Sequence, residues 1–101
     1  MEIRDLIPYG RENAVTRENL CILTGLNDRV VRNEIKKLRR DMPILNLQDR
    51  SGYYMPRTDN DFELMELKRF INQESKRARS IFYSLKGAKE FLKENEKHTA
   101  I

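Results

Sequence analysis

The residues best suited to chemistry lie in one stretch, residues 27–40, and they are mostly cations. Residues 27–41 carry six Lys or Arg against three Asp or Glu. At about 100° per residue, a helix over this stretch gathers the following side chains on one face or beside it: Arg29, Arg32, Asn33, Lys36, Lys37 and Arg40. Arg and Lys pair with phosphates, and Arg and Asn also pair with base edges in a duplex major groove, which admits one helix. The pattern therefore predicts binding to double-stranded DNA.

The opposite side of the same helix is apolar. Val31, Ile35 and Leu38 fall on one stripe, so this side is expected to pack on a core. Asn27 is placed to cap the helix, and Asp28 in its first turn suits the positive end of the helix dipole. Scattered cations are also common on solvated surface helices, so the neighbouring elements have to decide between the two interpretations.

A shorter helix precedes the basic one, with a glycine turn between them. Thr16 is a good N-cap, and Leu20 with Leu23 supplies an apolar face. Gly25 stands where this helix has to stop, because a positive φ costs glycine nothing. Leu26 is then expected to turn inward. Two helices joined in this way predict a helix-turn-helix unit.

The periodicity changes after the basic helix. Pro43 stops the helix, and residues 44–48 are compatible with a strand in which Ile44 faces inward. Residues 49–52 have turn chemistry, and residues 53–55 form a second short strand. Alternation predicts that one of the two adjacent tyrosines in that strand is buried and the other exposed. Two strands with a polar turn directly after the basic helix form a wing.

These features resemble the winged helix-turn-helix family, and in particular the biotin-repressor type of N-terminal DNA-binding domain. The resemblance covers roughly residues 3–56. It rests on the small Cys21 four positions before the glycine turn, on Val31 six positions after it, and on the Gly52-Tyr53 pair that begins the last strand. The chain is also similar to small prophage-encoded proteins of Gram-positive bacteria.

The resemblance implies where DNA contacts lie. The basic helix would enter the major groove, and residues 49–52 would form the wing tip, with Arg50 in a minor groove or on a phosphate; otherwise Arg50 is only an exposed turn residue. Thr16 and Arg17 begin a helix whose N-terminus can hold a phosphate, although Thr16 is first of all a cap. Thr24 departs from the family, which often has an apolar residue there. The candidate DNA-binding residues are Asn27, Arg29, Arg32, Asn33, Lys36, Lys37, Arg40, Arg50, Thr16 and Arg17.

Residues 1–57 are therefore expected to form one winged helix-turn-helix domain. Its first helix covers residues 1–7, and Ala14–Val15 is expected to add a short extended piece. The expected fold class is mainly α with a small β wing, followed by a long C-terminal helix.

Residues 58–94 have the pattern of that long helix, with Asp59 or Asn60 as its cap and residues 95–101 as a frayed tail. Apolar residues recur at heptad spacing, which favours a partner helix. A homodimer is the favoured arrangement, and a bend near Asn72–Ser75 that folds the helix back is the alternative. The expected dimerisation residues are Leu64, Leu67, Ile71, Ala78, Ile81, Leu85 and Leu92.

The remaining features bound the function. The long helix carries a second basic cluster, which consists of Lys76, Arg77, Arg79 and Lys86. This cluster would extend the DNA-binding surface, although such residues more often only flank the apolar stripe of a helix. The net charge of +4 leans toward an anionic partner, and a single cysteine forms no internal disulfide and suits a reducing cytoplasm. A membrane span is not expected. Because the lone His98 lies in the tail, and zinc-type spacing and a glycine-rich phosphate loop are absent from the sequence, no enzyme activity, metal or cofactor is expected.

The leading hypothesis is a sequence-specific double-stranded DNA-binding protein without enzymatic activity. Repression of transcription and a role at a phage replication origin would both use such an element, and the sequence does not choose between them. The alternative is a protein-interaction or assembly module that works through the heptad helix, residues 60–94.

Overall fold

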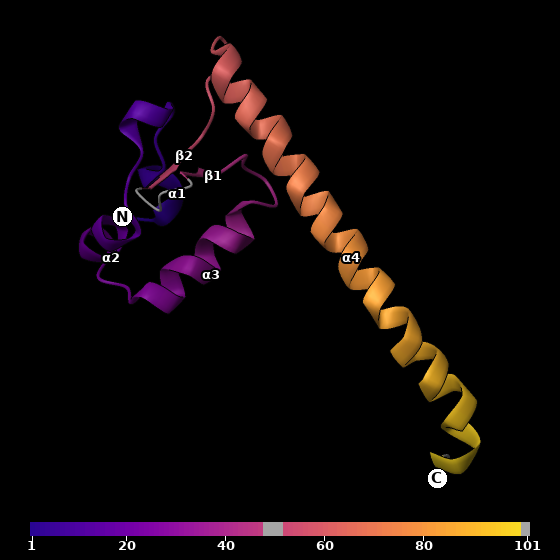
Figure 1. The fold of residues 1–101 in the computed structure, drawn as a ribbon. Helices are drawn as coiled ribbons and strands as arrows, with labels where there is room; N and C mark the ends of the chain where they lie inside the picture. The colour runs from indigo at the N-terminus through magenta and orange to yellow at the C-terminus, as the bar shows by residue number, and fades with distance from the viewer. Residues whose placement is uncertain (48–51, 100–101) are drawn as a thin grey trace. The chain divides into compact units, whose positions relative to one another are not determined.

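The structure is a computed structural model that describes residues 1–47 and 52–99, with side chains described as far as residue 96. It contains two compact units, Met1–Lys68 and Arg69–Ile101. The helices and strands labelled in Figure 1 are α1 (Ile3–Leu6), α2 (Arg17–Thr24), α3 (Asp28–Leu38), β1 (Leu45–Asn46), β2 (Tyr53–Tyr54) and α4 (Asp61–Thr99). A short 3-10 helix, Arg11–Asn13, lies between α1 and α2. The predicted fold class is confirmed: N-terminal helices, a two-stranded antiparallel hairpin and a long C-terminal helix.

The predicted limits of α2 and the predicted start of α3 are confirmed. The Thr16 hydroxyl accepts a hydrogen bond from the Asn19 N–H at 3.0 Å, and the Asn27 side-chain oxygen accepts one from the Val30 N–H at 2.9 Å. Each bond satisfies an N–H that the first helical turn leaves without a partner. Between the helices, Gly25 has φ of 74°, and its N–H donates to the Cys21 carbonyl at 2.8 Å. Local chemistry therefore fixes where the two helices start and where the first one stops.

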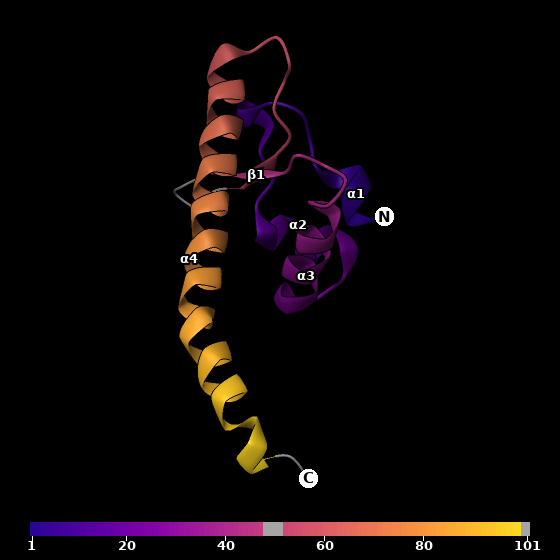
Figure 2. The ribbon, with the colours of Figure 1, turned by 90° about the vertical axis from the view of Figure 1, so that its right-hand side faces the viewer.

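The core of the first unit lies where α1, α2 and α3 meet the two strands, a grouping that Figure 2 draws from a second side. Val31 and Ile35 of α3 are buried as predicted, and Leu38 packs partly buried against the same core. The buried core residues are Ile3, Ile7, Leu20, Val31, Ile35, Ile44, Tyr53 and Met55. One side of α3 is therefore held against the rest of the unit.

Two predictions about α2 and its turn were wrong. Leu23 is 52% exposed, because the covered side of α2 runs over Leu20, Cys21 and Thr24 and leaves Leu23 outside it. Leu26 is 38% exposed instead of turning inward. Thr24 takes the covered position, and its hydroxyl group donates a hydrogen bond to the Leu20 carbonyl at 2.6 Å. This hydrogen bond explains how a threonine fits there.

The hairpin carries a third extended segment. β1 pairs with β2 antiparallel, with Asn46 opposite Tyr53. Val15 pairs with the other edge of Tyr53 through two backbone hydrogen bonds of 3.0 and 2.8 Å, which confirms the extended piece at Ala14–Val15. The predicted alternation of the tyrosines was wrong, because Tyr53 and Tyr54 are both buried.

Tyr54 is buried because the start of α4 belongs to the same unit. Its pKa is raised by burial and by the nearby carboxylates of Glu66 and Glu63. Glu63 is 1% exposed, and its carboxylate accepts hydrogen bonds from the Arg57 N–H at 3.0 Å and the Asn60 side-chain amide at 2.9 Å. The first unit thus reaches Lys68, past the boundary near residue 57 suggested by the sequence pattern.

Helix α4 is continuous in hydrogen bonding from Asp61 to Thr99. Asn60 is its cap, because the Asn60 side-chain oxygen accepts from the Glu63 N–H at 3.1 Å. The helix is not interrupted at Asn72–Ser75, and it continues past residue 94 into the segment expected to be a frayed tail. The side-chain amide of Asn95 donates to the Phe91 carbonyl at 2.8 Å, which supports this last part.

Candidate nucleic-acid interface

Helix α3 turns a polar face to solvent. We call this the α3 face; it consists of Arg29, Arg32, Asn33, Lys36 and Lys37, all of which are exposed. Behind it, Val31 is 0% and Ile35 is 2% exposed. A helix fixed by its apolar side and cationic on its outer side can approach a polyanion without moving relative to its own core.

The helix is shorter than predicted. It ends at Leu38, and Arg40 lies in the following turn rather than on the helix. The N–H groups of Asp41 and Met42 both donate to the Leu38 carbonyl at 2.9 Å, so the chain tightens there. Arg40 is nevertheless exposed, as expected for a phosphate contact or a solvated residue.

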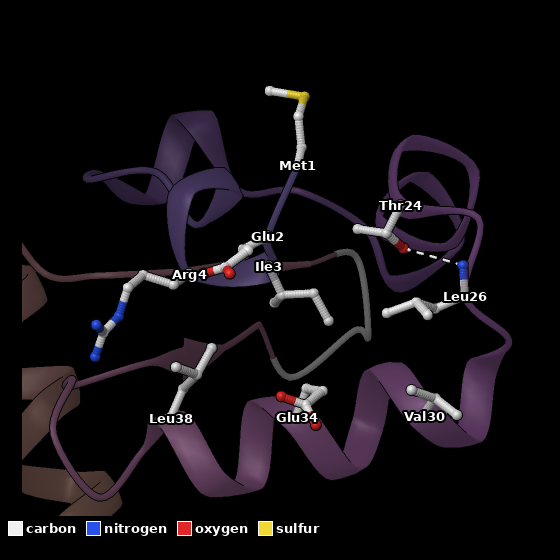
Figure 3. A pocket seen from close by; sticks show the side chains of 9 residues that line it. All are labelled: Met1, Glu2, Ile3, Arg4, Thr24, Leu26, Val30, Glu34 and Leu38. Carbon is white, nitrogen blue, oxygen red and sulfur yellow. Dashed lines mark hydrogen bonds between the residues drawn. The ribbon is translucent and has the colours of Figure 1, made fainter.

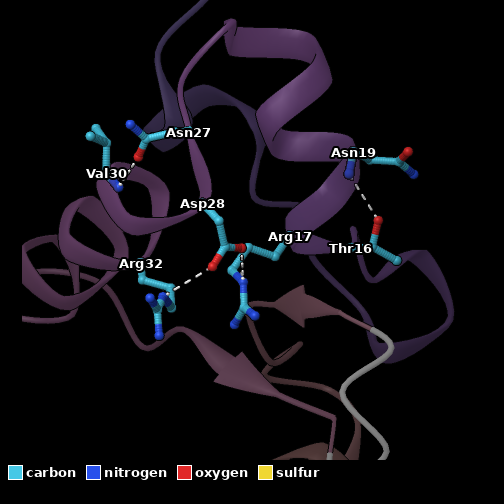
Figure 4. Close-up of polar contacts among 7 residues, drawn as sticks. All are labelled: Thr16, Arg17, Asn19, Asn27, Asp28, Val30 and Arg32. Atoms are coloured by element: carbon cyan, nitrogen blue, oxygen red, sulfur yellow. Dashed lines mark hydrogen bonds and ion pairs between the residues drawn. The ribbon is translucent and has the colours of Figure 1, made fainter.

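At the start of α3, one carboxylate joins two arginines, as Figure 4 shows. Asp28 forms an ion pair with Arg17 from the first turn of α2 and another with Arg32, whose Nε lies 3.2 Å from the carboxylate. A hydrogen bond with the side chain of Tyr53, followed by that with Asp28, raises the pKa of Arg17. From the sequence, Asp28 was expected only to suit the positive end of the helix dipole. The Asp28–Arg32 spacing of four residues was a usable signal, whereas Arg17 is brought in by the fold.

This Asp28 cluster, defined as Arg17, Asp28 and Arg32, remains open to solvent. The side chains of Arg17, Asp28 and Arg32 are 41%, 50% and 57% exposed. Ion pairs at this exposure contribute at most about 1 kcal/mol, because water screens them. The cluster edges a hollow that is also lined by Thr16, Glu18, Cys21, Asn46 and Tyr53. Breaking either of these ion pairs therefore requires little free energy.

Other cations of the first unit have different partners. The Arg39 Nε donates to the Ile44 carbonyl at 3.1 Å, and Arg57 forms an ion pair with Glu12. Arg11 lies over the Phe62 ring, 5.3 Å from its centroid. These three arginines stabilise loops and the start of α4, where each has a structural partner. The predicted wing contact Arg50 and most of the wing tip, residues 48–51, lie outside the described residues.

A second hollow lies between the start of α1 and the side of α3, and Figure 3 shows its lining. Ile3, Leu26, Val30 and Leu38 provide apolar surface there. Two carboxylates and one cation also line it, namely Glu2, Glu34 and Arg4. With this charge balance it does not suit a phosphate, so the α3 face and the Asp28 cluster are the anion-binding candidates of the first unit.

The second unit consists of the later turns of α4 and exposes much apolar surface. Of the predicted dimerisation residues, Leu64 and Leu67 fall in the first unit and are half-buried. The others are exposed: Ile71, Ala78, Ile81, Leu85 and Leu92. Phe82 and Phe91 beside them are each 69% exposed. Exposed large apolar side chains at heptad spacing are typical of a helix that packs against another helix.

The net charge is carried by the second unit. Residues 69–101 contain eight Lys or Arg and four Asp or Glu, whereas residues 1–68 contain twelve of each. The first unit therefore has no net charge, so any attraction to an anion depends on where its cations lie on the surface. In the second unit the predicted basic cluster is exposed, and Arg77 lies 3.5 Å from Glu74 one turn earlier.

Among the described residues, no set of His, Cys, Asp and Glu side chains is grouped to hold a metal ion. Over the same residues, no helix combines the length and apolar character that crossing a membrane requires. No protein-family model, curated protein or solved structure matches the chain, so function has to be inferred from its own side chains.

Proposed function

We propose that this protein binds double-stranded DNA sequence-specifically, as a transcriptional regulator of the winged helix-turn-helix type. The observation that carries the proposal is the α3 face: exposed Arg, Lys and Asn side chains on a helix whose other side is anchored by the buried Val31 and Ile35. Side chains of these types bind phosphates and read base edges.

The roles follow from position along α3. Arg29, Arg32 and Asn33 lie in its first two turns, the part of a recognition helix that meets base edges. Asn33 pairs with an adenine edge through its amide, and the arginines pair with guanine or phosphate. Farther along, Lys36 and Lys37 contact phosphates and fix the orientation of the helix. Arg40 in the following turn and Arg50 in the wing extend these backbone contacts.

The proposed active form is a homodimer through the second unit. Its support is the exposed apolar stripe of α4, which includes Ile81, Leu85 and Leu92. Two copies related by a two-fold axis present two α3 faces, so the bound site is expected to have matching two-fold symmetry.

The proposal is tested by selection from a pool of random duplexes with the full-length protein. The expected result is an enriched, two-fold symmetric site whose affinity falls steeply with salt, with a slope of about −0.9 per phosphate contacted. A selection without enrichment, repeated at low salt, would reject sequence-specific binding.

A second candidate function is a protein-interaction or assembly module, and the exposed aromatic residues of the second unit favour it. Phe82, Tyr83 and Phe91 are 69%, 81% and 69% exposed. Large apolar side chains grouped on a surface in this way are typical of a site that contacts another protein. In this case substitutions on the α3 face leave partner binding unchanged, whereas Phe82→Ala and Phe91→Ala abolish it. The DNA-binding proposal predicts that Asn33→Ala reduces recognition of the selected duplex.

A further inference from the structure

We propose that Asp28 is a specificity-determining residue, which keeps two DNA-binding arginines occupied until the duplex offers the right base. This inference rests on the proposed function. Its basis is the Asp28 cluster, in which one carboxylate holds Arg17 and Arg32 at the edge of the α3 face. Figure 4 shows both guanidinium groups meeting that carboxylate.

The Asp28 carboxylate is expected to weaken DNA binding, because it lies among the cations that would contact phosphates. Phosphates are the sequence-independent source of affinity, and each one must compete with Asp28 for the same guanidinium groups. When a phosphate displaces Asp28 from the arginines, the Asp28 carboxylate loses both ion-pair partners and lies beside a second negative charge. Arg17 and Arg32 therefore add little to binding at an arbitrary sequence.

The correct base sequence removes this cost. A carboxylate in the major groove accepts hydrogen bonds from exocyclic amino groups, above all N4 of cytosine, whereas guanine and thymine present acceptors that repel it. When an amino group lies opposite the first turn of α3, it replaces the arginines as the partner of Asp28. Arg17 and Arg32 are then released to phosphates or bases. Repulsion at wrong sites together with attraction at the right one is how many interfaces obtain specificity.

The arrangement fits this exchange in two ways. All three side chains are between 41% and 57% exposed, so breaking their ion pairs requires no opening of the core. Arg17 and Arg32 also line one hollow with Tyr53, from the strand that follows the wing tip, so both side chains border the same open space at the edge of the α3 face.

The test compares Asp28→Asn with Glu34→Gln in the full-length protein. Both substitutions remove one negative charge from α3, but Glu34 forms its ion pair with Lys37 at 3.6 Å, whereas Asp28 pairs with Arg17 and Arg32. Affinities for the selected duplex and for an unrelated duplex are measured over a range of salt concentrations. Circular dichroism establishes that each variant is folded.

The expected result is that Asp28→Asn binds the unrelated duplex roughly tenfold tighter at about 0.1 M salt, with a salt slope steeper by about one, because an additional phosphate is neutralised. The preference for the selected duplex falls by a similar factor, and a selection repeated with this variant loses its preference at one cytosine or adenine position. Glu34→Gln changes none of these quantities to the same extent. In a chain with Arg17→Gln and Arg32→Gln, Asp28→Asn no longer tightens binding to the unrelated duplex, since that gain comes from the released arginines.

Equal behaviour of Asp28→Asn and Glu34→Gln would overturn the role of Asp28, because bulk charge would then explain both. Undiminished tightening on the unrelated duplex by Asp28→Asn in the chain without the two arginines would overturn it as well. Either result leaves the proposed function standing, provided that the wild-type protein has a selected site. A wild-type protein without a selected site would overturn both.

Discussion

Asn60 and Glu63 are joined by two hydrogen bonds at the start of α4. The Asn60 oxygen accepts from the Glu63 N–H, and the Glu63 carboxylate accepts from the Asn60 amide while also binding the Arg57 N–H. The bond from the Glu63 N–H to Asn60 is the N-cap half of a capping box, whereas the Glu63 carboxylate binds the Asn60 side chain and not its backbone N–H. We call this arrangement the Asn60–Glu63 cap. It joins the first turn of α4 to the preceding loop of the first unit through a buried carboxylate.

Replacing that carboxylate is expected to destabilise the first unit. Glu63→Ala leaves the Arg57 N–H and the Asn60 amide without partners in a covered site, at a cost of about 1–3 kcal/mol. Urea unfolding measures the change. Asp61→Asn, in the same helical turn but exposed, is the control and is expected to lose under about 1 kcal/mol from the helix dipole. Equal losses in the two variants would contradict the role given to Glu63.

Two glycine-to-alanine substitutions should have opposite effects. Gly52 has φ of 151°, and a Cβ there would lie 2.7 Å from the Val15 carbonyl oxygen, so Gly52→Ala is expected to cost about 1–3 kcal/mol. Gly87 lies within α4 with nothing within 4 Å of a Cβ, so Gly87→Ala is expected to stabilise the helix by about 0.5–1 kcal/mol. Thermal unfolding followed by circular dichroism compares the two. A tolerated Gly52→Ala would contradict the close packing of Val15 against β2.

The oligomeric state should depend on the second unit. A chain that ends after Lys68 keeps the Asn60–Glu63 cap and is expected to fold as a monomer, whereas the full-length protein is expected to sediment as a dimer. A chain that ends after Arg57 also loses Glu63 and is expected to be less stable than the longer one. Sedimentation and unfolding measurements on the three chains separate these effects. Dimerisation that survives removal of residues 69–101 would contradict the role of the exposed α4 stripe.

Local signals in the sequence were enough to predict much of this fold. Thr16, Gly25 and Asn27 act within a few residues of their own positions, so the limits of α2 and the start of α3 followed from residue type. The buried Val31 and Ile35 followed from helical periodicity. The fold class was predictable because each of these signals agreed with the others.

Features that depend on distant segments were not predictable in the same way. Tyr54 was expected to alternate with Tyr53, but the start of α4 supplies neighbours to it that strand periodicity does not contain. The ion pair between Arg17 and Asp28 joins residues eleven positions apart and exists only once the two helices cross. Leu23 was placed on the wrong side because the covered side of an eight-residue helix depends on its neighbours.

The central claim, that the α3 face reads bases, is tested most directly by binding of Asn33→Ala to the selected duplex and to an unrelated one. The expected result is a loss of about 1–3 kcal/mol on the selected duplex, relaxed preference at one base pair, and little change on the unrelated duplex. Asn72→Ala, an exposed asparagine in the second unit, is the matched control and should bind like the wild-type protein. Unchanged recognition of the selected duplex by Asn33→Ala, Arg29→Ala and Arg32→Ala would contradict the account.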